Sequence, residues 1–257
     1  MKHSIGFIGG GRVTKILLQG FANKRKEFES VVVFDTNTEV LNDLKKQFPG
    51  ITLAETASKA AKQDVVFIAL HPPVIMETLD KISGVVSAET TVISLAPKIN
   101  HEKILSKLPV VKKIVRVIPN ATSYINEGYN PVCFAKKFPS EKKQEILDLL
   151  EMLGHTFEVT ESKLESYAIM SAMLPTYFWF QWKELVEIGQ KLGLGEKECV
   201  EAVYETLNAS LDLMYKTDLT PAQVIDLIPV KPIGEHEPQI IEIYHTKLIA
   251  LFEKIKP

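Results

Sequence analysis

Short apolar runs alternate with amphipathic or charged stretches from residue 4 to about residue 160. Several of these runs are continuous in Val, Ile, Phe and Leu, which is typical of strands covered on both faces in a parallel sheet. Alternation of this kind over so long a stretch indicates a doubly wound α/β fold. The expected strands are residues 4–9, 31–35, 51–54, 65–70, 91–96, 114–118, 132–135 and 155–160.

After Thr160 the pattern becomes helical only. We expect helices over 175–192, 196–215 and 238–254, with a further helix start where Thr220 precedes a proline and a glutamine. The start of the first helix carries aromatic residues from Tyr177 to Trp182 on most of its circumference, which predicts burial by the other domain or by a partner subunit. The predicted domains are therefore 1–160, α/β, and 161–257, all-helical.

A glycine-rich turn follows the first expected strand, in the stretch from Gly6 to Thr14. It ends a strand and opens a helix, the context that a dinucleotide-binding fingerprint of a Rossmann-type domain requires. Gly9 suits the tight turn, and Gly11 lets the backbone approach a pyrophosphate. Backbone N–H groups around Arg12 and Val13 would then receive the negative charge.

Asp35 ends the second expected strand, where a carboxylate can accept hydrogen bonds from the ribose hydroxyls of the adenosine half. A carboxylate there repels a 2′-phosphate, and the adjacent Thr36 and Asn37 supply no cation. Asp35 therefore favours NADH, while Arg12 leaves NADPH open as the cofactor. A turn-forming aspartate at a strand end is the structural alternative.

Three further strand ends should face the same crevice, because ligands of open α/β sheets lie outside the carboxyl ends of the strands. With the glycine turn and Asp35, they complete the predicted cofactor site. Its residues are Gly9, Gly11, Arg12, Val13, Asp35, Thr36, Leu70, His71, Pro72, Ala96 and Asn120.

Composition excludes several other classes of protein. Apolar residues make up 46% of the 257 residues and charged residues 24%, a globular balance with a net charge of only −2. We therefore expect no nucleic-acid partner and no membrane partner. Two distant cysteines and no Cys/His cluster predict no metal site, and the absence of a signal-peptide core or of a long apolar run predicts a cytoplasmic protein.

The glycine turn, the strand end at 65–73 and the stretch Arg116–Asn120, followed by Glu127 and Gly128, together resemble the pyrroline-5-carboxylate reductase family. The N-terminal part is also similar to the broader group of coenzyme-F420-dependent NADP oxidoreductases. The resemblance implies an NAD(P)H-dependent reductase that transfers a hydride to the C=N carbon of a cyclic imine, giving proline. It also implies a homodimer joined through the helical domains.

Two stretches depart from the family pattern. In the interdomain segment, Ser171, Pro175 and Tyr177 match, whereas Met173 and Leu174 replace a serine and a glycine. The family's Pro-Gly-Gly-Thr-Thr loop corresponds to residues 232–236, where Glu235 and His236 replace two hydroxyl donors. The expected proton or hydrogen-bond donors are Ser171, Tyr177 and His236. The physiological substrate is expected to differ from the family's if these changes alter the site.

Two alternatives remain open. A 3-hydroxyacid-type dehydrogenase has a similar two-domain build, although its Gly-x-x-x-Lys-x-x-Asn pattern is absent around Lys183. A dinucleotide-binding or regulatory protein that has lost turnover is the second alternative, because fold alone does not fix function.

Overall fold

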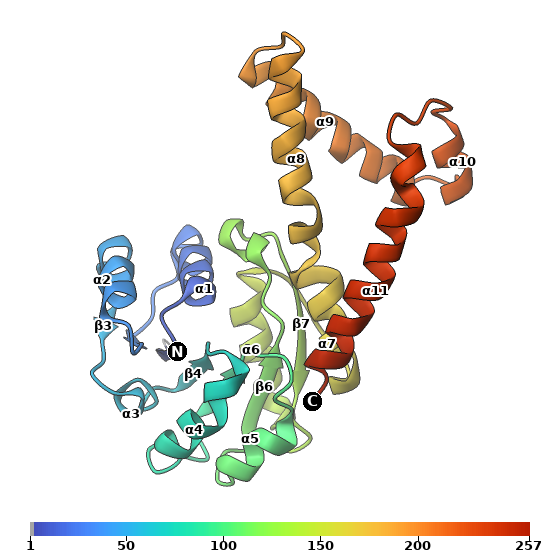
Figure 1. The fold of residues 1–257 in the computed structure, drawn as a ribbon. Helices are drawn as coiled ribbons and strands as arrows, with labels where there is room; N and C mark the ends of the chain where they lie inside the picture. The colour runs from blue at the N-terminus through green and yellow to red at the C-terminus, as the bar shows by residue number, and fades with distance from the viewer. Residues whose placement is uncertain (1–2) are drawn as a thin grey trace. The chain divides into compact units, whose positions relative to one another are not determined.

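The structure is a computed structural model that describes residues 3–257 (Figure 1). The chain forms two compact units. The first unit comprises the chain up to Ala172 together with the C-terminal segment Phe252–Pro257. The second unit is Met173–Leu251. No helix among the described residues is long and apolar enough to cross a membrane.

An eight-stranded sheet forms the centre of the first unit, as the alternation predicts. Its strand order is β3-β2-β1-β4-β5-β6-β7-β8, in which the first six positions have the doubly wound Rossmann order. The strands are β1 Ser4–Ile8, β2 Ser30–Phe34, β3 Thr52–Leu53, β4 Val65–Ile68, β5 Thr91–Ser94, β6 Lys113–Val117, β7 Gly128–Phe134 and β8 Gly154–Glu158.

Helices cover both faces of this sheet, because alternate residues of each strand point to opposite sides. In β4, Val65 and Phe67 join the core cluster that includes helices α1 (Arg12–Asn23), α2 (Thr38–Gln47) and α6 (Ser140–Glu151). Val66 and Ile68 join the opposite cluster, with helices α3 (Ala57–Ala60), α4 (Pro72–Ile82) and α5 (His101–Lys107). All four β4 residues are buried, which explains their uninterrupted apolar sequence.

One local prediction needs correction. The strand predicted at 132–135 begins four residues earlier, at Gly128, and pairs antiparallel with β6, so the sheet is not wholly parallel. Gly128 and Pro131 concealed its start, because both residue types are depleted in strands. The N-cap of α2 is Asn37, whose Oδ1 accepts hydrogen bonds from the backbone N–H groups of Glu39 (2.9 Å) and Val40 (3.2 Å).

The residues from 161 to 172 continue the first unit as short helical turns, among them α7 (Leu164–Tyr167) and a π-helix (Ala168–Ala172). The helical pattern predicted for the rest is confirmed. The helices are α8 Leu174–Lys191, α9 Glu196–Tyr215, α10 Pro221–Asp226 and α11 Glu237–Ile255, whose end belongs to the first unit. Thr220 accepts a hydrogen bond from the Gln223 N–H at the start of α10, which completes the expected capping box.

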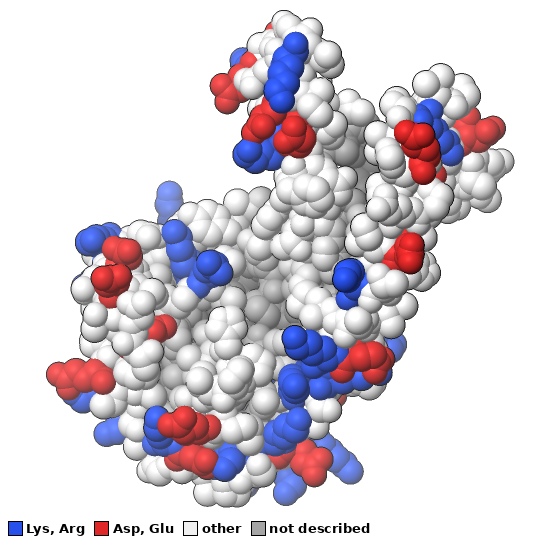
Figure 2. Space-filling view, in the orientation of Figure 1, with Lys and Arg blue, Asp and Glu red and all other residues white. Residues whose placement is uncertain are grey.

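Acidic and basic side chains are interspersed on the face of the molecule seen in Figure 2. This distribution agrees with the net charge of −2. On that face, no broad surface of one sign is present that would attract a polyanion.

Candidate functional site: a cleft at the carboxyl ends of the parallel strands

A cleft of about 710 Å³ lies at the point where the strand order reverses between β1 and β4. Ligands of open α/β sheets bind at this kind of switch point, outside the carboxyl ends of the strands. The predicted cofactor-binding residues that line the cleft are Gly11, Arg12, Val13, Leu70, His71, Pro72 and Ala96.

The turn after β1 depends on Gly9, whose φ is +105°, a conformation that L side chains rarely adopt. A Cβ atom there would lie 2.3 Å from the carbonyl oxygen of Ala69. The Gly9 N–H donates to the Phe34 carbonyl at 2.7 Å, and its own carbonyl accepts from the hydroxyl of Thr14 at 2.6 Å. Gly9 is therefore buried beneath the cleft, where it shapes the turn, and the fully buried Thr14 locks that turn.

Gly11 has a different role, because a Cβ atom built on it meets nothing within 4 Å. It is the N-cap of α1 in an extended conformation (φ −73°), and as a glycine it has no side chain to bond the first-turn N–H groups. The first turn contains no acidic residue and begins with Arg12. This helix start has the open space, the backbone donors and the positive dipole end that a diphosphate requires.

Asp35 lies just past β2, and both of its carboxylate oxygens accept backbone hydrogen bonds. Oδ2 accepts from the Gly10 N–H at 2.7 Å and Oδ1 from the Asn37 N–H at 2.8 Å. The aspartate thus ties the glycine turn to the β2 loop, as the structural alternative predicted. A carboxylate has about four lone-pair sites, so two acceptor sites remain for ribose hydroxyls.

The remaining predicted cofactor residues lie apart from the lining of this cleft. Thr36 is exposed beside Asp35. Asn120 is buried after β6, where its Oδ1 accepts from the backbone N–H and the hydroxyl of Thr122, and its Nδ2 donates to the Ser171 carbonyl at 3.2 Å. Asn120 therefore joins the end of β6 to the π-helix.

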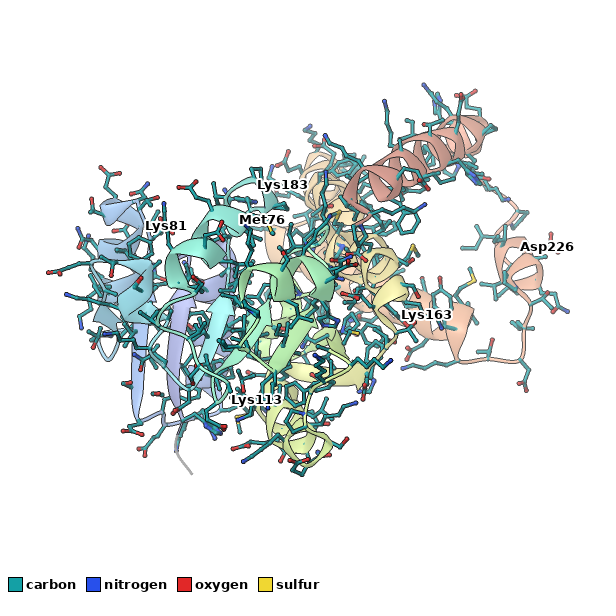
Figure 3. The ribbon with its side chains drawn as sticks, turned by 90° about the horizontal axis from the view of Figure 1, so that it is seen from below. Met76, Lys81, Lys113, Lys163, Lys183 and Asp226 are labelled. Atoms are coloured by element: carbon teal, nitrogen blue, oxygen red, sulfur yellow. The ribbon has the colours of Figure 1, made fainter. Side chains whose placement is uncertain are left out.

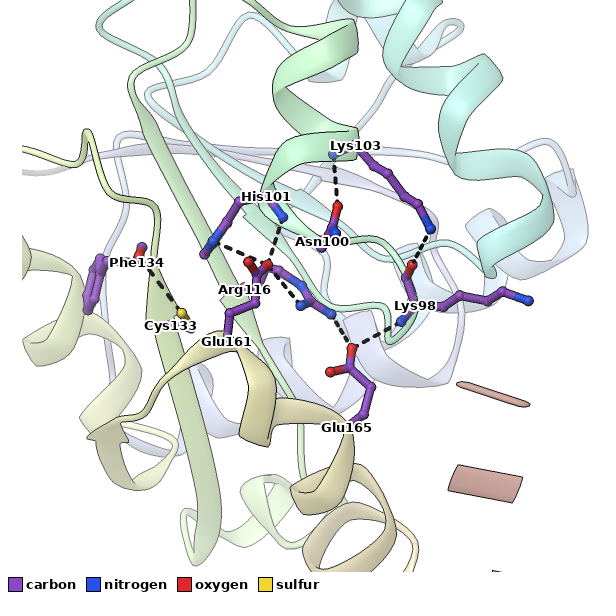
Figure 4. Close-up of polar contacts among 9 residues, drawn as sticks. All are labelled: Lys98, Asn100, His101, Lys103, Arg116, Cys133, Phe134, Glu161 and Glu165. Atoms are coloured by element: carbon purple, nitrogen blue, oxygen red, sulfur yellow. Dashed lines mark hydrogen bonds and ion pairs between the residues drawn. The ribbon is translucent and has the colours of Figure 1, made fainter. Parts of the chain in front are cut away.

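The sequence reasoning missed some cleft residues and a buried polar cluster. Lys15, Asp43 and Gln47 also line the cleft; they lie on helix faces that pattern analysis treats as solvent-exposed. The missed cluster surrounds Arg116, which is 1% exposed on β6 (Figure 4). A buried arginine requires a carboxylate partner, so an arginine within an otherwise apolar strand was the sequence signal that could have predicted this cluster.

The partners of Arg116 come from the turns after β8. Its Nη2 lies 2.5 Å from Oε1 of Glu165, and its Nη1 lies 3.0 Å from Oε1 of Glu161. Glu165 is only 2% exposed. The same Glu161 oxygen accepts from the His101 backbone N–H at 2.7 Å and lies 3.2 Å from His101 Nδ1. Two carboxylates are therefore held on one buried guanidinium (Figure 4).

Glu161 should make the fold sensitive to acid. Burial raises its pKa, but hydrogen bonds from His101, together with that from Arg116, outweigh burial and lower the pKa to about 2. A depressed carboxyl pKa stabilises the fold above pH 4.5, and this contribution is lost as the pH falls towards 2. We expect Glu161→Gln to flatten the stability profile over that range, as measured by urea denaturation at pH 7, 4 and 3. An unchanged acid slope would contradict this assignment.

Cys133 lies next to this cluster and is not an activated nucleophile. Burial, and then the charge of Glu161, raise the pKa of its thiol to about 11. The thiol therefore stays protonated near neutral pH.

The three predicted proton donors occupy different elements. Ser171 is buried in the π-helix, and its hydroxyl donates to the Tyr167 carbonyl at 2.7 Å. Tyr177 lies on α8 with its ring 6.2 Å from that of Tyr244, and burial, and then the neighbouring Tyr244, raise its pKa. His236 is exposed in a 3₁₀ turn, 3.5 Å from Glu235.

Comparison with known proteins supports the interpretation of the cleft. Residues 4–98 match the family model described as NADP oxidoreductase, coenzyme F420-dependent. The chain is 25% identical to pyrroline-5-carboxylate reductase of Corynebacterium melassecola over 224 residues, which cover 86% of this chain and 83% of that protein. It is 31% identical to pyrroline-5-carboxylate reductase of Pasteurella multocida over 183 residues, which cover 68% of this chain and 66% of that protein.

The fold also matches a crystal structure of Plasmodium falciparum pyrroline carboxylate reductase with NADP bound. The TM-score is 0.81 at 22% identity, with 99% of this chain and 97% of that chain covered. The doubly wound sheet and the glycine turn are typical of a dinucleotide-binding domain. The matching family model and relatives place the chain in the NAD(P)-dependent oxidoreductase class. Within this class, the chain belongs to the pyrroline-5-carboxylate reductase family.

Proposed function

We propose that this protein reduces a small cyclic imine of the pyrroline-5-carboxylate type with NADH or NADPH. The observation that carries the proposal is the open α1 start at Gly11, next to a 710 Å³ cleft at the sheet's switch point. The names of its relatives supply the substrate class. A nicotinamide bound there supplies the hydride.

Under this proposal, the chain's own residues bind the coenzyme and orient it in the cleft. The backbone N–H groups at Arg12 and Val13 hold the diphosphate, and Asp35 accepts from the adenosine ribose. The segments that follow β4 and β5, which include Leu70, His71 and Ala96, form the walls of the cleft.

We assign proton delivery to Tyr177 and His236. Ser171 is the third candidate, and its hydroxyl would first have to release the Tyr167 carbonyl to which it donates. Reduction of a C=N bond adds a hydride to carbon and requires a proton on nitrogen. His236 is an exposed imidazole beside the Glu235 carboxylate, and an imidazole nitrogen can donate a hydrogen bond or relay a proton. The high pKa of Tyr177 keeps its hydroxyl protonated, so that it can donate a hydrogen bond.

The hydroxyacid dehydrogenase alternative requires a lysine that can exchange protons. Lys183, labelled in Figure 3, forms an ion pair with Glu187 one turn further along exposed α8. Hydrogen bonding to Glu187 and its negative charge raise the pKa of Lys183, so that it holds its proton more tightly. The Gly-x-x-x-Lys-x-x-Asn pattern of those dehydrogenases is absent around Lys183, which favours the reductase.

Oxidation of NAD(P)H, followed at the nicotinamide absorbance band, tests the proposal. The substrates are pyrroline-5-carboxylate, a cyclic imine without a carboxylate, and a set of small 2-oxo acids. We expect turnover with imines and none with the oxo acids. Turnover with oxo acids alone would favour the dehydrogenase, and coenzyme binding without any turnover would favour a regulatory protein.

We predict that NADH binds more tightly than NADPH. The Asp35 carboxylate is fixed by two backbone donors, and the stretch from Thr36 to Glu39 contains no cation to offset a 2′-phosphate. Like charges at close range should cost roughly 1–2 kcal/mol at a partly exposed site, about tenfold in Kd. Side-by-side calorimetric titrations with NADH and NADPH check this prediction. In the Asp35→Asn variant, the ratio of the NADPH Kd to the NADH Kd should be smaller than in the wild type. Tighter binding of NADPH by the wild type would overturn the prediction.

We also propose that the second unit joins two copies of the chain. Within residues 173–251, all of which the structure describes, Cys199 alone is buried, whereas Trp179 and Phe180 on α8 are 48% and 67% exposed. Helices with this much exposed apolar surface require a partner. Sedimentation velocity should show a dimer at micromolar concentration. Phe180→Glu should yield monomers, and Gln190→Glu on the same helix should not. A monomeric wild type would contradict this proposal.

A further inference from the structure

The loop that joins β5 to α5 forms one wall of the cleft. Its residues Leu95, Ala96 and Pro97 line the cleft, and the next residue, Lys98, has a φ of +73°. A lysine in this left-handed conformation is strained, because its Cβ atom crowds the backbone. Such a residue persists only where its surroundings hold it in place.

Among the hydrogen bonds that hold this loop, two end on the carboxylates bound by Arg116. The Lys98 N–H donates to Oε1 of Glu165 at 3.2 Å, and the His101 N–H donates to Oε1 of Glu161 at 2.7 Å. The Lys98 carbonyl accepts from the Lys103 ammonium at 3.3 Å. Figure 4 shows the Lys98 and His101 N–H groups donating to the two carboxylates that contact the buried guanidinium.

Arg116 connects the loop to the central sheet. It lies on β6, and its register partner on β5 is Ser94, the residue that directly precedes the loop. Its Glu165 partner is almost completely buried, and the two charges lie 2.5 Å apart. A buried ion pair of this geometry holds its members in fixed positions. The conformation of the cleft wall is therefore set by the central sheet.

We propose that Glu165 and Arg116 are positioning residues that hold the Ala96–Pro97 wall against the nicotinamide half of the bound coenzyme. This inference rests on the proposed function. A doubly wound sheet has two mononucleotide-binding halves. Asp35 at the end of β2 marks the adenosine half, so the wall after β5 belongs to the other half. Loss of the anchor should weaken contacts to nicotinamide and leave the adenosine contacts intact.

Two substitutions at Lys98 test the anchored conformation. Lys98→Gly and Lys98→Val both remove the same charge, but only glycine adopts a φ of +73° without strain. Calorimetry should show NADH binding weakened at least tenfold in Lys98→Val and within twofold of wild type in Lys98→Gly. ADP-ribose, which lacks nicotinamide, should bind both variants as it binds wild type. Equal NADH affinities in the two variants would overturn the inference. So would an equal loss of affinity for NADH and for ADP-ribose in Lys98→Val.

A second variant removes the anchor itself. Arg116→Met combined with Glu165→Met replaces the ion pair without leaving an isolated buried charge, a kind of change that folds tolerate. We expect NADH binding to weaken at least tenfold while ADP-ribose binding stays within twofold; unchanged NADH binding would contradict the anchor. If this variant does not fold, the comparison of Lys98→Gly with Lys98→Val decides whether the inference holds. Failure of the wild type to bind either ligand would instead refute the proposed function.

Discussion

Gly11→Val is expected to abolish NADH binding and leave the fold intact. A Cβ atom at Gly11 meets nothing within 4 Å, and the extended backbone there suits any residue, so valine fits the apo protein. In the complex, the same side chain would occupy the space where the backbone meets the diphosphate. Loss of several N–H to phosphate hydrogen bonds should cost about 3 kcal/mol or more, over a hundredfold in Kd.

The control for this experiment is Gly50→Val. A Cβ atom at Gly50 also meets nothing within 4 Å, and this residue lies between α2 and β3, outside the lining of the cleft. Calorimetry should show wild-type NADH affinity for Gly50→Val, and both variants should unfold at similar urea concentrations. NADH binding by a folded Gly11→Val protein with undiminished affinity would contradict the assignment of the glycine turn.

Arg116→Ala is expected to destabilise the first unit by about 3–5 kcal/mol. The change leaves Glu165 buried without its cationic partner, and it removes one of the hydrogen bonds on Glu161. Removal of one member of a buried ion pair is costly, because the remaining charge cannot regain its hydration. Urea denaturation at pH 7 measures the loss in the free energy of unfolding.

The matched control is Arg116→Met with Glu165→Met, in which neither charge remains. Although it changes two residues, this variant should be more stable than Arg116→Ala. A double variant less stable than the single one, or a loss below about 1 kcal/mol for Arg116→Ala, would mean that the pair is not desolvated as the structure indicates.

Most of the fold follows from the sequence, because the periods of strand and helix differ and each is repeated many times. The helix predicted at 196–215 appears with those bounds, and the strand predicted at 65–70 is a buried strand over 65–68. The antiparallel direction of β7 could not be predicted from the sequence, because no local residue pattern distinguishes an antiparallel strand from a parallel one. Pro131 also obscures the strand itself. The π-helix over 168–172 likewise has no pattern of its own.

The candidate site was predicted in part. Gly9, Gly11 and Asp35 follow from a motif of fixed spacing, with each residue type chosen by backbone geometry or charge. The anchor around Arg116 did not follow, because Glu161 and Glu165 lie 45 and 49 residues further along the chain. The left-handed Lys98 carries no sequence signal, because lysine has no preference for that conformation.

Residues 232–236 would bear on the choice of substrate under the proposed function. Glu235 and His236 stand where the resemblance places two hydroxyl donors, and both side chains are exposed in this chain. A negative charge at this turn would repel a substrate carboxylate. The imine without a carboxylate in the substrate set shows directly whether the protein has lost the requirement for that group.

A crystal structure of the protein soaked with NADH tests the central claim most directly. We predict diphosphate density at the start of α1, within hydrogen-bonding distance of the Arg12 and Val13 N–H groups. The adenosine ribose should lie against Asp35, and nicotinamide should lie beside Ala96 and Pro97. A cleft that stays empty at saturating NADH, or coenzyme bound elsewhere on the chain, would contradict the account.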